Sequence, residues 1–98
     1  MLDKLTIDDF SGRVGETFAA TAEEGATLTL TLRSADALHA PPGDQGRTPF
    51  SLVFTDEAED HLPQQIVEVR HEELGEFPLF VVPLGPSEHG MRYEAVFT

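Results

Sequence analysis

The chain has 98 residues, with eighteen acidic residues against six basic ones, a net charge of −12 and no cysteine. This length predicts a single domain, residues 1–98, with one modest core. The lack of cysteine excludes disulfides, thiolate metal sites and cysteine nucleophiles. Because a strongly acidic chain repels phosphate backbones and anionic lipid, we expect neither a nucleic-acid partner nor a membrane partner.

Export signals and membrane spans are not predicted. No apolar stretch approaches the roughly 20 residues that a membrane span needs. The first residues lack the basic region followed by an apolar one that marks a signal peptide. We therefore expect synthesis in the cytoplasm without a signal peptide, while the sequence leaves the final location open.

A short helix is predicted near the start of the chain. Thr6 is followed three residues later by Asp9, a spacing that resembles a capping box, and acidic residues in a first turn suit the helix dipole. The predicted helix covers about Thr6 to Ser11 and packs Leu5 and Phe10 onto a sheet.

The chain after Gly15 has the pattern of β-strands. The first strand is predicted at 16–22, and a tight turn at 23–25 follows it. Residues 26–33 alternate between Leu on one face and Thr on the other. The alternation changes phase at Ser34, which predicts a β-bulge or a bend there. Further strands are predicted around 50–55 and 67–71.

The run 77–84 is apolar at both odd and even positions. Such a strand is expected to be covered on both faces, either by the helix or by a partner molecule. Phe80, Val82 and Leu84 are therefore candidates for partner contact. Pro78 and Pro83 each remove a backbone donor, so clean strand pairing is expected only in the middle of the run. A turn is predicted at 85–90.

A last strand at 93–97 completes about six strands with no helices between them. This order predicts an all-β fold, a single small antiparallel barrel or sandwich with a short N-terminal helix. Thr27, Thr29, Thr31, Glu68 and Arg70 are predicted to be mainly exposed. The predicted core consists of Leu28, Leu30, Leu32, Phe50, Leu52, Phe54, Val67, Val69, Leu79, Val81, Tyr93 and Phe97.

His71 is the candidate for chemistry, because it shares the inward parity of Val67 and Val69 and is followed by Glu72 and Glu73. A buried histidine bonded to a carbonyl or carboxylate explains the same pattern. The acidic stretch 56–60 lacks the spacing of a calcium loop and is predicted to be a solvated turn. Residues 87–89 (Ser-Glu-His) are adjacent in a turn and cannot form a catalytic relay. No catalytic, cofactor-binding or metal-binding residue is assigned, and no cofactor is predicted.

Six segments spread over nearly the whole chain carry a family resemblance. They are Leu2-Asp3-Lys4-Leu5-Thr6-Ile7-Asp8-Asp9-Phe10, Pro49-Phe50-Ser51-Leu52-Val53-Phe54, Leu62-Pro63-Gln64-Gln65, Val69-x-His71-x-x-Leu74-Gly75, Leu79-Phe80-Val81-Val82-Pro83-Leu84-Gly85 and Tyr93-Glu94-Ala95-Val96-Phe97. Together they resemble a small uncharacterised bacterial family, a domain of unknown function of about this length. The resemblance implies that His71 and the turn at 62–64 belong to a shared family pattern. It also implies that relatives lie near proteins similar to phage-tail collar or fibre proteins, and hence an accessory role in a tail-like assembly.

The sequence therefore favours a non-enzymatic β-module that binds a protein partner or self-assembles. The alternative is a small enzyme or metal-binding module centred on inward-facing His71 with Glu72 or Glu73.

Overall fold

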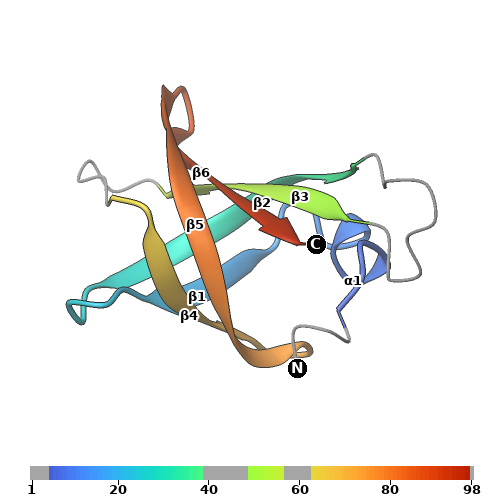
Figure 1. Cartoon of the computed structure of the whole chain (residues 1–98), viewed down its shortest axis with the longest axis horizontal. Helices are drawn as coiled ribbons and strands as arrows, with labels where there is room; N and C mark the ends of the chain where they lie inside the picture. Colours follow the sequence, from blue (N-terminus) through green and yellow to red (C-terminus); the bar gives the residue numbers. More distant parts are fainter. Residues whose placement is uncertain (1–4, 39–48, 57–62, 98) are drawn as a thin grey trace.

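The computed structural model describes residues 5–38, 49–56 and 63–97. One helical turn and six strands make up this part of the chain (Figure 1). They are α1 (Asp8–Ser11), β1 (Thr17–Thr21), β2 (Thr27–Ala37), β3 (Phe50–Asp56), β4 (Gln65–His71), β5 (Gly75–Ser87) and β6 (Gly90–Phe97).

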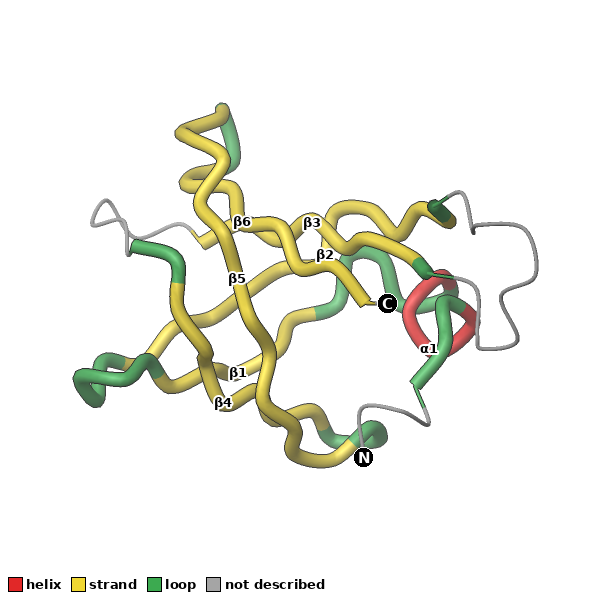
Figure 2. Tube along the Cα trace, in the orientation of Figure 1, coloured by secondary structure: helices red, strands yellow, loops and turns green. Residues whose placement is uncertain are grey.

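The six strands form a closed barrel in the order β1-β2-β3-β6-β5-β4, with every neighbouring pair antiparallel (Figure 2). The all-β prediction is confirmed, and the fold is a barrel rather than a sandwich. Closure pairs β1 with β4, so every strand has a neighbour on each side. Within the described residues, no helix is long and apolar enough to cross a membrane.

Helix α1 is a single turn, shorter than the predicted span from Thr6. Of the predicted capping box only one half is present: the Asp9 carboxylate accepts a hydrogen bond from the Thr6 backbone N–H at 2.8 Å. The N-cap residue is Ile7, which makes no side-chain capping bond. Leu5 and Phe10 are buried as predicted.

Phe10 is the centre of an aromatic cluster at the α1 end of the barrel. Its ring centroid lies 5.6 Å from that of Phe97, 5.8 Å from Phe50 and 6.3 Å from Phe77. Phe50 and Phe97 stack face to face at 4.5 Å. The cluster joins side chains of β3, β5 and β6 to α1, so this end of the barrel is filled by packed rings.

The strand registers place the predicted core inside. Eleven of the twelve predicted core residues are buried, and Leu28 is half-buried because it pairs with Ala20 close to the β1–β2 turn. The prediction that Thr31 is exposed is wrong, since it is half-buried between its cross-strand neighbours Thr17 and Thr55. Thr27, Thr29, Glu68 and Arg70 are exposed as predicted.

The predicted bulge lies in β2. Leu32 pairs with Phe54 and Ser34 with Val53, which leaves Arg33 as the extra residue. The Arg33 side chain donates a hydrogen bond to the Thr55 hydroxyl at 2.9 Å. Thr55 is buried on the outer side of β3, and this bond gives its hydroxyl a partner there.

Strand β5 is longer than predicted and contains both prolines. It pairs with β4 over residues 75–81 and with β6 over residues 82–87. The expectation that the prolines restrict pairing to the middle of the run is wrong, because the ladder passes through Pro78, and only a register shift follows Pro83. The hairpin turn is correspondingly short: Ser87 pairs with Gly90, which adopts a φ of 111°.

Of the two covers predicted for β5, the helix or a partner molecule, the helix does not cover the outer face of the strand. Helix α1 reaches the inner side of the strand through Phe10, whereas the side chains of Phe80 and Leu84 are 51% and 40% exposed. Val82 is half-buried.

The acidic stretch 56–60 is only partly described. Asp56 is buried at the end of β3, so the prediction of a solvated side chain is wrong for this residue. Residues 57–60 lie outside the described residues.

Candidate functional site

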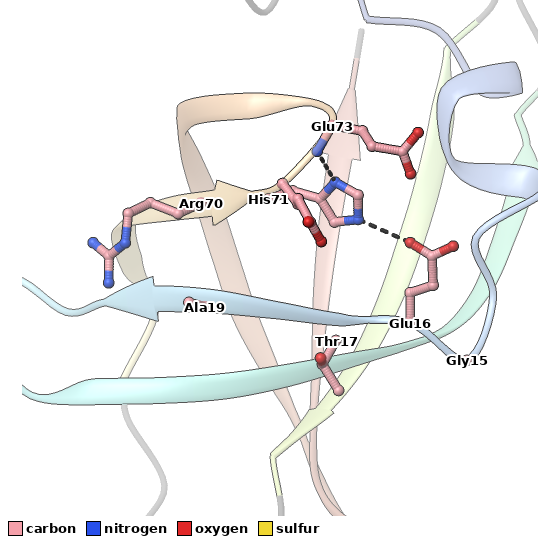
Figure 3. A pocket seen from close by; sticks show the side chains of 8 residues that line it. Gly15, Glu16, Thr17, Ala19, Arg70, His71 and Glu73 are labelled. Atoms are coloured by element: carbon pink, nitrogen blue, oxygen red, sulfur yellow. Dashed lines mark hydrogen bonds and ion pairs between the residues drawn. The ribbon is translucent and has the colours of Figure 1, made fainter.

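An open depression of about 640 Å³ lies where the residues before and within β1 meet the end of β4 (Figure 3). Its lining contains both the histidine and the two glutamates singled out from the sequence. The lining residues are Gly15, Glu16, Thr17, Ala19, Arg70, His71, Glu72 and Glu73.

His71 forms the inner wall of this depression. The parity of β4 directs it inward as predicted, and its side chain is only 6% exposed. The imidazole lies against Phe18 with ring centroids 4.6 Å apart. The ring is therefore part of the barrel core on one side and of the depression on the other.

Both ring nitrogens of His71 have partners. Nδ1 accepts hydrogen bonds from the backbone N–H groups of Glu73 at 3.0 Å and Leu74 at 3.2 Å. Because Nδ1 is an acceptor, the proton of the neutral ring resides on Nε2. Nε2 then donates to the Glu16 carboxylate at 2.8 Å (Figure 3).

The imidazole caps the β4–β5 turn. His71 pairs with Gly75, which adopts a φ of 85°, so three residues form the turn between them. A side-chain acceptor bonded to the N–H groups two and three residues later is the usual cap of a helical turn, a position that Asp, Asn, Ser or Thr most often occupies. Here the histidine ring takes that position.

The two neighbouring glutamates have different positions. The Glu73 carboxylate accepts a hydrogen bond from Arg13 at 3.0 Å and does not bond the imidazole, whose partner in that turn is the Glu73 backbone. Glu72 is exposed and lines the depression. Arg13 also lies 3.9 Å from the Glu16 carboxylate. We call Arg13, Glu16, His71 and Glu73 the histidine cluster.

The histidine cluster lies at the end of the shortest ladder of the barrel. Only Ala19–Thr21 of β1 pair with Glu68–Arg70 of β4, and we call this ladder the closing seam. Glu16 and Arg13 precede β1, whereas His71 and Glu73 follow the seam on the β4 side. The cluster therefore extends the closing seam with side-chain bonds where backbone pairing stops.

These contacts favour a structural role for His71. A metal ion bound at Nδ1 would displace two backbone hydrogen bonds, and one at Nε2 would displace the Glu16 bond. Within residues 5–38, 49–56 and 63–97, no group of three or more His, Asp or Glu side chains is arranged to hold a metal ion. The alternative of an enzyme or metal module centred on His71, Glu72 and Glu73 thus gains no support from the ring's partners.

A second candidate surface lies on the outside of the barrel. Ile66 of β4 is the cross-strand partner of Phe80 of β5, and both side chains are 51% exposed. Val96 of β6 is 52% exposed. It lies two residues beyond Glu94, on the same outer face of β6 and past the last paired position between β5 and β6, which is Val82 with Glu94. We call Ile66, Phe80 and Val96 the apolar row.

Comparison with protein families gives a match over nearly the whole chain. The model of a family described as a domain of unknown function, DUF6916, covers residues 5–97. The chain belongs to this family. No curated protein and no solved structure matches it.

The histidine cluster of this DUF6916 domain can be tested by its effect on stability. In His71→Leu, two backbone N–H groups of the β4–β5 turn lose their acceptor, so we expect the free energy of unfolding to fall by about 1–3 kcal/mol. Urea denaturation measures this loss. Glu72→Gln, in the same turn, serves as the control and is expected to change stability by less than about 0.5 kcal/mol. Equal stability of the two variants would contradict the capping role.

Proposed function

We propose that this DUF6916 domain is a non-enzymatic interaction or assembly module that binds another protein through the apolar row. The supporting observation is the direct pairing of Ile66 and Phe80, each half exposed, on the outer face of the barrel. Single exposed apolar side chains are common on protein surfaces, but contiguous ones mark interaction sites. Val96 extends the row onto a third strand.

The partner-contact residues proposed from the sequence adjoin this row. Phe80 belongs to it, and Val82 is the next outward residue along β5. Leu84 follows near the register shift and is 40% exposed. Phe is among the aromatic residues that are enriched at the core of protein interfaces.

The kind of assembly is a further part of the proposal. The resemblance to a bacterial family associated with phage-tail-like proteins suggests an accessory role in a tail-like structure. A β-barrel that presents an apolar row on its outside is compatible with attachment to a larger particle.

Photo-crosslinking tests the proposal. A benzoylphenylalanine at position 80, in cells that naturally contain the protein, is expected to give adducts with another polypeptide. The same group at Val14, which is apolar and 51% exposed but distant from the row in sequence and fold, is the matched control. We expect Ile66→Ser and Val96→Ser to reduce the adduct from position 80 while leaving urea denaturation unchanged. Equal adduct yields at 14 and 80 would overturn the proposal.

A further inference from the structure

Two acidic residues flank the apolar row on opposite sides. Glu68 lies two residues after Ile66 on β4, and Glu94 lies two residues before Val96 on β6, so both carboxylates share the outer face with the row. The registers place Glu68 beside Pro78 and Glu94 beside Val82. Along β5 these two levels are about 13 Å apart. The row therefore lies diagonally between two carboxylates.

Neither carboxylate has an ion-pair partner among the described residues. Arg70 lies two residues beyond Glu68 and donates to the Thr21 hydroxyl at 3.1 Å. Arg92 lies two residues before Glu94 in the sequence, on the side away from Val96, and it pairs with Gly85 of β5 and Thr55 of β3. Both arginines are thus further from the row than the glutamates. Along β4 and β6, the charged side chains nearest to the row are therefore the two glutamates.

We propose that the partner carries an apolar centre flanked by Lys or Arg side chains that face Glu68 and Glu94. This inference rests on the proposed function and adds the charge of the partner to it. Complementary charges at the rim of an interface steer association and select among partners, while the apolar centre supplies most of the affinity. The apolar row then provides affinity, and the two glutamates provide selection for a basic surface.

Charge also decides against a second copy of this chain as the occupant. The chain has a net charge of −12 and contains a single lysine, Lys4. Two copies would each bring this negative net charge to the interface, and like net charges oppose association. A cationic protein surface is the occupant that relieves this repulsion.

The test uses the full chain with the photo-crosslinker at position 80. Glu68→Gln/Glu94→Gln removes the two flanking charges, and we expect the adduct yield to fall roughly two- to thirtyfold, as for the loss of two exposed ion pairs. Glu23→Gln/Glu24→Gln, two exposed acids of the β1–β2 turn, makes the same change in net charge and is expected to leave the yield within about twofold. Adduct yield with the unaltered glutamates should also fall as sodium chloride rises from 50 to 500 mM.

The outcomes separate the two proposals. The adduct yield could depend on Ile66 and Val96 but change equally in the Glu68→Gln/Glu94→Gln and Glu23→Gln/Glu24→Gln variants. This result would overturn the proposal of a basic partner and leave the proposal of an interaction module intact. A crosslinked peptide without Lys or Arg, or an adduct of two copies of this chain, would also overturn it. Absence of any row-dependent adduct would overturn both.

Discussion

A chain that ends at Arg92 is expected to be unfolded. Removal of residues 93–98 takes most of β6 away, and this strand is the partner of β3 over Phe50–Asp56 and of β5 over Val82–Ser87. It also removes the buried side chains of Tyr93 and Phe97. Loss of one buried aromatic side chain costs about 3–5 kcal/mol, and a small domain has only about 5–15 kcal/mol in total.

Thermal unfolding followed by far-ultraviolet circular dichroism measures this effect. The truncated chain should give no cooperative transition. Val96→Ser, which changes an exposed residue of the same strand, is the control and should melt within a few degrees of the unaltered protein. A truncated chain that melts cooperatively near the full-length temperature would show that β6 is dispensable.

Phe10→Ala is expected to lower the free energy of unfolding by about 3–5 kcal/mol. The Phe10 side chain is fully buried and lies among the rings of Phe18, Phe50, Phe77 and Phe97. Its removal leaves a cavity between α1 and four strands, which the surrounding packed side chains fill only in part. The expected loss is large because this single turn of helix holds its position in the core mainly through that ring.

Urea denaturation at equilibrium gives the loss directly. Phe10→Leu keeps most of the buried volume and should retain at least half of the stability that Phe10→Ala loses. Val14→Ala, an exposed apolar truncation in the same segment, should cost less than about 0.5 kcal/mol. If Phe10→Ala costs no more than Val14→Ala, the aromatic cluster does not stabilise the barrel.

Local alternation was sufficient to predict the strands and most of the core. The Leu and Thr residues of β2 differ in hydropathy at every step, so the inward face and the change of phase near Ser34 can be predicted without any knowledge of neighbouring strands. The same holds for Phe50, Leu52 and Phe54 in β3. Antiparallel barrel and sandwich share these local patterns, which is why the sequence left the choice between them open.

Features that depend on distant pairing could not be predicted in this way. The hydropathy of β5 is high at both parities, and alternation alone cannot tell a covered outer face from an exposed apolar row. The Glu16–His71 bond joins the residue before β1 to the last residue of β4, and these two strands meet only because the barrel closes. The sequence indicated an inward His71 bonded to a carbonyl or a carboxylate, and it named Glu72 and Glu73 for the alternative enzyme or metal-binding module. Nothing local identifies Glu16 or Arg13 as members of the histidine cluster.

The shortness of the closing seam has a consequence for aggregation. Where pairing covers few residues, local opening costs less free energy than global unfolding. Opening between β1 and β4 would uncover two strand edges, each with unpaired backbone donors and acceptors that can join a strand of another chain. The histidine cluster bonds across the end of that seam and so opposes this opening, which makes intermolecular β-pairing through the uncovered edges less favourable.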